Sequence, residues 1–135
     1  MRIVLDTNVL VSALLTQGGI PDQAVGLVLA GRCALIVDSR ILAEYRAVLE
    51  RPEFGFPSGE VDALLAFVER AEWVVADPLD LTLPDETDRP FLEVAVAGGA
   101  DALVTGNPKH FRVRGIRLDL AVLTPRGLLE RLARG

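Results

Sequence analysis

The fold is decided by the stretch RIVLDTNVLVSALL at residues 2–15. Its first apolar run, residues 2–5, is short and continuous, which is typical of a strand buried on both faces. The second run, residues 8–15, has the length of a short helix. The junction of the two runs is polar and consists of Asp6, Thr7 and Asn8. A solvated turn would explain these residues and so would a metal site, so the rest of the chain must decide between them.

Strand-like and helix-like segments alternate along the rest of the chain. Short apolar runs predict further strands at 34–37, 73–75, 102–105 and 121–123. Apolar periodicity and end signals predict helices at about 21–31, 39–51, 58–72 and 89–98, a short turn or helix at 107–111, and a last helix from Thr124 onward. This alternation predicts one α/β domain over residues 1–135, a three-layer α/β/α sandwich with a mainly parallel central sheet.

The composition excludes several classes of protein. One cysteine, Cys33, and one histidine, His110, rule out a disulfide framework within the chain and a His/Cys zinc site. No apolar run reaches the ~20 residues that span a bilayer, and the first strand follows Met1 directly, so a cytoplasmic protein without a membrane segment is expected. A net charge of −5 argues against coating nucleic acid by bulk electrostatics, but leaves room for an enzyme that holds nucleic acid beside an acidic, metal-loaded pocket.

Polar residues follow several of the predicted strands. In parallel sheets functional groups gather at the carboxyl ends of the strands. Asp6 ends the first strand, Asp38 follows the second, and Thr105 and Asn107 stand at the end of the strand predicted at 102–105. Each also has an ordinary explanation, because an aspartate can cap a helix, a threonine hydroxyl can bond the backbone and an asparagine can occupy a turn.

Glu44 interrupts a buried helix face. The helix predicted at 39–51, for which Ser39 is a candidate cap, has a buried stripe made of Ile41, Tyr45, Val48 and Leu49. Glu44 lies on or beside that stripe, where a carboxylate is costly unless something pairs with it. An arginine partner or an edge position that reaches solvent would explain it, and so would a functional site.

The loop at residues 77–88 brings further acids to the start of the helix predicted at 89–98. Asp88 could cap that helix, and Asp85 and Glu86 could favour its positive end. Carboxylate and amide oxygens without soft ligands suit Mg²⁺ or Mn²⁺, and a divalent cation removes the repulsion between like charges. The chemistry that matches is phosphodiester hydrolysis, in which the metal activates water and stabilises charge on phosphate.

Three stretches together resemble the PIN-domain family. They are IVLDTNVLVSALL, SRILAEYRAVLERP and PDETDRPFLEVAVAGGADALVTGNPKHF. The third resembles the VapC-like toxin components of toxin–antitoxin systems. The resemblance implies an α/β/α fold, an Mg²⁺- or Mn²⁺-dependent ribonuclease acting on RNA, a cognate antitoxin and a homodimer.

The same resemblance implies the roles of individual residues. The catalytic set is Asp6, Glu44, Asp88 and Asn107. Asp6 and Asp88 would coordinate metal, and Glu44 would bind metal or orient the attacking water. Asn8 and Thr105 would support these ligands. Asn107 stands where a fourth acid is common, and its uncharged amide leaves open whether one metal binds or two, with Asp85 or Asp101 as alternative carboxylates.

A basic segment follows the last of these residues. NPKHFRVRGIR, at 107–117, contains no acid, and Lys109, Arg112 and Arg114 are candidates for contact with RNA. A solvated surface strand would explain the same residues equally well.

Other functions remain open. A PIN fold retained as a binding module, with weak or no nuclease activity, is the main alternative. A haloacid-dehalogenase-like phosphatase needs an acid two residues after the first aspartate, where this chain has Asn8. A response-regulator receiver domain needs a phosphate-accepting aspartate at the end of a central strand, which the RPEFGFP region does not offer.

Overall fold

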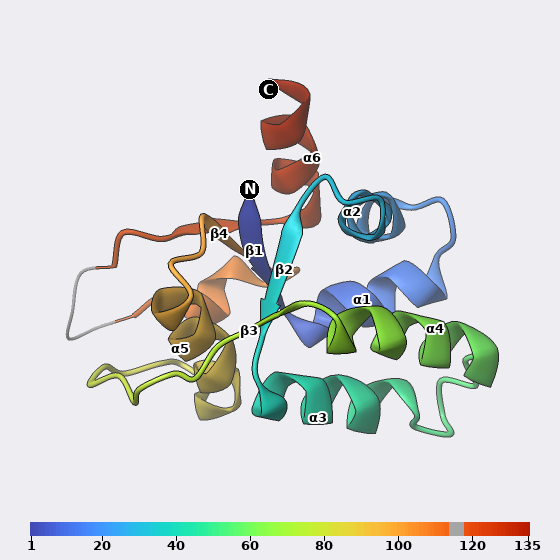
Figure 1. The fold of residues 1–135 in the computed structure, drawn as a ribbon, viewed down its shortest axis with the longest axis horizontal. Helices are drawn as coiled ribbons and strands as arrows, with labels where there is room; N and C mark the ends of the chain where they lie inside the picture. The colour runs from blue at the N-terminus through green and yellow to red at the C-terminus, as the bar shows by residue number, and fades with distance from the viewer. Residues whose placement is uncertain (114–117) are drawn as a thin grey trace.

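The computed structural model describes residues 1–113 and 118–135, and its centre is a five-stranded parallel sheet (Figure 1). The strands are β1 (Arg2–Leu5), β2 (Ala34–Val37), β3 (Glu72–Trp73), β4 (Ala102–Val104) and β5 (Ala121–Leu123), in the spatial order β3-β2-β1-β4-β5. Every neighbouring pair is parallel. In the central pairings Ile3 lies opposite Leu35 on one side and Ala102 on the other.

Helices cover both faces of the sheet. They are α1 (Thr7–Leu15), α2 (Ile20–Leu29), α3 (Ser39–Leu49), α4 (Ser58–Glu69), α5 (Arg89–Ala97) and α6 (Pro125–Ala133), with 3₁₀ turns η1 (Glu86–Asp88) and η2 (Pro108–Phe111). Helix α5 lies on one side of the sheet, and α1 and α2 lie on the other (Figure 1). The predicted α/β/α sandwich with a parallel sheet is confirmed. None of the helices in the described ranges is long and apolar enough to cross a membrane.

Several helix and strand ends lie one to three residues from their predicted positions, and the end of β3 and the cap of α3 show the physical reason. Strand β3 ends at Trp73 rather than residue 75, because β2 turns into α3 after Val37 and the last bond of the ladder is Val74 N–H to the Val37 carbonyl, 3.0 Å. Helix α3 is capped by Asp38 rather than Ser39, since Asp38 Oδ1 accepts from the Ile41 amide at 2.9 Å.

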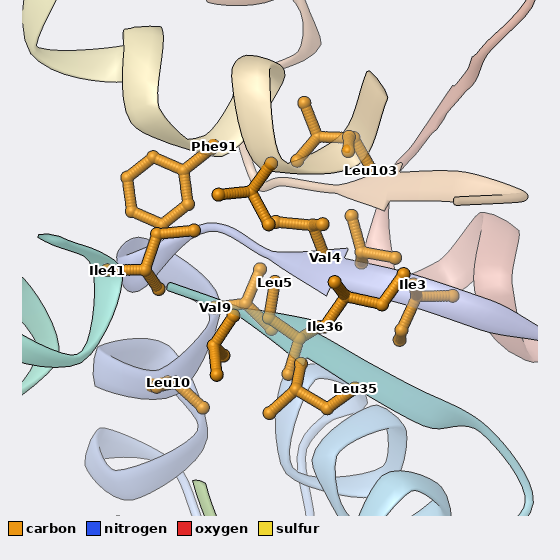
Figure 2. Close-up of a cluster of buried hydrophobic side chains, with 14 of the residues drawn as sticks. Ile3, Val4, Leu5, Val9, Leu10, Leu35, Ile36, Ile41, Phe91 and Leu103 are labelled. Carbon is orange, nitrogen blue, oxygen red and sulfur yellow. The ribbon is translucent and has the colours of Figure 1, made fainter. Parts of the chain in front are cut away.

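Strand β1 is the middle of the core. Ile3, Val4 and Leu5 are at most 1% exposed, which explains why the run is apolar without alternation. Figure 2 shows Val4 and Phe91 of α5 on one side of the strand and Leu10 of α1 on the other. Burying each large apolar side chain contributes about 1.5–3 kcal/mol.

The end of α5 lies unusually close to the sheet, and a glycine permits this. A Cβ atom on Gly98 would stand 2.9 Å from Cγ2 of Ile36, nearer than side chains pack. Gly98 therefore lets α5 rest directly on β2.

The order of the strands creates a topological switch point at one edge of the sheet. From β1 the chain moves outward to β2 and β3, then crosses to the other side of β1 to form β4 and β5. The connections that leave β1 and β4 diverge at their carboxyl ends, and parallel sheets bind ligands at such a switch point. The Asp6 amide still bonds to the Val104 carbonyl, at 2.9 Å, so Asp6 lies at this switch point.

Candidate active site

Asp6 is buried between β1 and β4. Its carboxylate accepts a 2.7 Å hydrogen bond from Thr105 Oγ1, and the residue is 6% exposed. Asp6 is the N-cap residue of α1 and makes no side-chain capping bond of good geometry. Burial raises the pKa of the Asp6 carboxyl, and the bond from Thr105 offsets part of this rise. The nearby Thr7 and Asn8 amides also lower the pKa of this carboxyl. Thr105 Oγ1 in turn accepts from the Asn107 amide at 3.0 Å, which ties the loop after β4 to the same carboxylate.

Asp88 reaches the same region from the start of α5. It is 9% exposed, and it does not cap the helix that it precedes. Its Oδ2 atom is buried and has no hydrogen-bond partner among the described residues, although Nδ1 of His110 lies 3.3 Å away in an ion-pair position. Burial raises the pKa of the Asp88 carboxyl to about 6, and the negative charges of Asp6 and Asp85 add to the rise. Asp88 is thus a buried acid beside other acids.

Glu44 is half-buried on α3 and turns toward the first residue of α1. It accepts a hydrogen bond from Thr7 Oγ1, and it makes no ion pair with any residue in the described ranges. The helix is held there by its neighbour Tyr45, whose fully buried hydroxyl donates to the Leu5 carbonyl at 2.5 Å. An arginine partner therefore does not explain Glu44, whose charge contributes to the raised pKa of Asp88.

Two amides complete the rim. Asn107, half-buried, has Nδ2 at 2.9 Å from Nε2 of His110, so the histidine ring stands between Asn107 and Asp88. Asn8 is exposed, and its Oδ1 accepts from the Gly106 amide at 3.1 Å, which fixes the turn after β4 against α1.

Three charged residues that the sequence analysis did not single out position the acidic loop. Glu93, 3% exposed on α5, accepts from Arg40 Nη1 at 2.8 Å and from the Leu79 amide at 2.9 Å. Arg89 donates to the carbonyls of Leu79 and Leu81, at 2.8 Å each. These bonds anchor the loop that leads into Asp88. Glu93 could have been found by the pattern that indicated Glu44, since each is a carboxylate within a buried helix face.

Other candidate acids lie elsewhere or serve the backbone. Asp101 accepts from the Arg2 amide at 2.8 Å, at the amino end of the sheet, so its suggested role as an extra ligand is wrong. Asp85 is exposed and caps η1 through the Thr87 amide and hydroxyl, which lower the pKa of its carboxyl. Asp38 caps α3.

Two of the three predicted RNA-contacting basic residues lie within the described part of the chain. Lys109 and Arg112 are exposed on and just after η2, close in sequence to Asn107 and His110. Arg114 lies outside the described residues.

The donor set suits a hard divalent cation. Within residues 1–113 and 118–135, no three Asp, Glu, His or Cys side chains already surround one point as metal ligands. The donors nevertheless fit by chemistry, because Asp88 has a buried carboxylate oxygen without a hydrogen bond and neighbouring carboxylates raise its pKa. A cation would satisfy that oxygen and remove the repulsion.

The comparison with protein families gave one match. The model of a family described as PIN domain matches residues 2–109. The matched segment contains Asp6, Glu44, Asp88 and Asn107. Among curated proteins the comparison gave no match.

Proposed function

The chain belongs to the PIN-domain family, whose fold is that of nucleases, and from this premise we propose that it is an Mg²⁺- or Mn²⁺-dependent endoribonuclease. The reaction is hydrolysis of an RNA phosphodiester bond. Because its RNA substrates are found there, such an enzyme would act in the cytoplasm.

One observation supports this proposal more than any other. Asp88 keeps a buried carboxylate oxygen without a hydrogen bond, and burial, together with the nearby charges of Asp6 and Asp85, raises the pKa of its carboxyl to about 6. Such an arrangement costs stability in the absence of a cation, and clusters of perturbed acids in a crevice are typical of functional sites. Asp88 makes no capping bond to α5, and the only basic group beside that oxygen among the described residues is Nδ1 of His110, at 3.3 Å.

The proposed role of each residue follows from its position in the site. Asp6 and Asp88 would hold the cation, with Thr105 fixing the carboxylate of Asp6 through its 2.7 Å bond. Glu44 would bind the cation or orient the attacking water. A bound divalent cation supplies a water of lowered pKa and stabilises the charge that develops on phosphate. Asn8 fixes the turn that carries Asn107 at the rim.

Asn107 determines how much charge the site offers. Its amide oxygen can ligate Mg²⁺ but carries no charge, so a second metal would be held weakly. The Asn107 side chain also faces His110 at 2.9 Å. We therefore expect one tightly bound metal.

The first test is cleavage of end-labelled structured RNA by the purified protein. We expect cutting with Mn²⁺ or Mg²⁺ and none with EDTA. Asp6→Asn removes a proposed metal ligand and should lower the rate at least about 100-fold. Asp101→Asn changes a carboxylate at the opposite end of the sheet and should leave the rate within about twofold.

Two results would contradict the nuclease assignment. RNA cleavage that persists in EDTA, or that Asp6→Asn carries out as fast as the wild type, would show that these acids do not form the catalytic metal site. Absence of cutting with either metal, together with RNA binding by the wild-type protein, would instead favour the binding module.

The biological role that we propose is the toxin of a toxin–antitoxin pair. Support comes from the resemblance of PDETDRPFLEVAVAGGADALVTGNPKHF to VapC-like toxins. We expect a cognate antitoxin and a homodimer on the same ground. Expression of the wild-type chain should arrest bacterial growth, and Asp6→Asn should abolish the arrest while the protein stays folded. If both proteins arrest growth equally, the arrest does not come from RNA cleavage at these acids, and the toxin assignment fails.

A further inference from the structure

A groove lies between α1, α2 and the start of α6. It has a volume of about 440 Å³, within the range that binds small ligands. Its lining includes Asn8, Ser12, Pro21, Gly106, Pro125 and Arg126. Helices α1 and α6 begin at the carboxyl ends of β1 and β5, so the groove opens at the same edge of the sheet as the acids.

Two residues that line the groove lie next to proposed site residues along the chain. Asn8 and Gly106 both line the groove and are joined by the 3.1 Å bond from the Gly106 amide to Asn8 Oδ1. Asp6 stands two residues before Asn8, and Asn107 directly follows Gly106. The groove therefore adjoins the chain segments that carry Asp6 and Asn107, and an RNA strand bound at the acids could extend toward it.

The chemistry of the lining favours a nucleotide. The surface of the groove is almost wholly apolar, and Pro21 and the largely buried Pro125 give it rigid walls against which a base can lie. Arg126 is the only charged residue that lines the groove, and it is exposed and makes no ion pair within the described ranges. It stands in the first turn of α6, where the helix dipole adds to its positive charge.

The positive charge of Arg126 distinguishes this groove from a neighbouring one. The groove between α1, α2 and α4, of about 580 Å³, is lined by Asp22 and Glu60 and by no basic residue. That surface would repel a phosphate backbone. The groove at Arg126 carries the complementary charge and adjoins the chain segments that carry Asp6 and Asn107.

We propose that this groove binds the RNA nucleotide adjacent to the cleaved phosphodiester, with its base against Pro21 and Pro125 and its phosphate at Arg126. The inference rests on the proposed function, since it is the acids that place the cleaved phosphate. Single-stranded RNA is the class that fits, because a base must leave its stack to enter the groove.

The test measures RNA binding separately from cleavage. Asp6→Asn serves as the non-cleaving background, and a fluorescein-labelled RNA hairpin with a single-stranded loop is the probe, followed by anisotropy. Adding Arg126→Ala should weaken binding about fivefold to tenfold and lower the salt-dependence slope by about 1. Adding Ser12→Leu, which fills the groove without a change of charge, should weaken binding by a similar factor.

The matched control is Arg131→Ala, an exposed arginine on the same helix that does not line the groove. It should change the affinity by less than about twofold. Equal weakening by the two arginine variants, unchanged binding by Arg126→Ala, or no binding of the hairpin at all would overturn the inference.

Cleavage distinguishes this failure from failure of the proposed function. In the otherwise wild-type protein, Arg126→Ala should raise KM and leave kcat within about twofold. A wild-type protein that never cuts RNA, but whose binding depends on Arg126 and Ser12, would refute the nuclease assignment and leave the groove as an RNA site. A protein that cuts RNA with an unchanged KM in Arg126→Ala would refute the groove alone.

Discussion

Two glutamates, Glu44 and Glu93, interrupt buried helix faces in this chain. Their partners indicate a structural role for Glu93 and leave Glu44 available to a functional site. Glu93 is enclosed by Arg40, Arg89 and the Leu79 amide. Burial by itself would raise the pKa of Glu93, but these partners outweigh burial and the pKa is lowered. Glu44 has only the hydroxyl of Thr7 among the described residues. The sequence marks both carboxylates in the same way, because the partners that distinguish them come from distant segments.

At Asp88 we predict that removal of the charge stabilises the metal-free protein. The folded pKa of about 6 exceeds the ordinary value of 3.8, so the folded state binds the proton more tightly than the unfolded state does. Stability is therefore lost as the pH rises from about 4 through 6. With EDTA at pH 7.5, Asp88→Asn should be more stable than wild type by about 1–2 kcal/mol, allowing for solvent screening, and below pH 4 the difference should vanish.

Urea unfolding at the two pH values measures this difference. Asp62→Asn, an exposed carboxylate on α4, should change stability by less than about 0.5 kcal/mol at either pH. An Asp88→Asn protein that is less stable than wild type at pH 7.5 would mean that the carboxylate is a structural group.

At the scale of elements, a few long-range bonds place the site. Tyr45 attaches α3 to the end of β1, and Glu93 attaches the loop before α5 to α3 through Arg40. The types and approximate bounds of the helices and strands follow from local periodicity and were predicted. The anchoring of residues 77–88 was not predicted. Arg40 and Glu93 are 53 residues apart, and nothing in the sequence around either residue indicates that the other is its partner.

We predict that Arg40→Ala destabilises the fold by about 2–4 kcal/mol, because it removes the 2.8 Å partner of a carboxylate whose side chain is 4% exposed. Arg46→Ala breaks a pair with Glu69 in which both side chains are about half exposed, and should cost less than about 1 kcal/mol. Urea unfolding at neutral pH compares the two variants. Equal costs would show that the pair of Arg40 with Glu93 does not anchor α5. Because the pKa of Glu93 is lowered, the cost of Arg40→Ala should shrink as the pH falls through the acid range.

At the scale of the molecule, the strand order brings the site together. Asp6 and Thr105 are 99 residues apart, yet they share a hydrogen bond because β4 lies beside β1 rather than at the sheet's edge. The sequence predicts a parallel sheet with polar groups at the carboxyl ends of its strands. It does not predict which strands are neighbours, since every strand is short, apolar and able to pair with any other. For the same reason Asp101 could not be excluded from the sequence alone, although it lies at the amino end.

The central claim is that the acids at this switch point form one divalent-cation site. Calorimetric titration of Mn²⁺ into the purified wild-type protein, Asp6→Asn and Asp101→Asn tests it most directly. We predict one site in the wild type and in Asp101→Asn, and loss of at least about tenfold in affinity in Asp6→Asn. Equal Mn²⁺ affinity in all three proteins, or no binding by the wild type, would contradict the account.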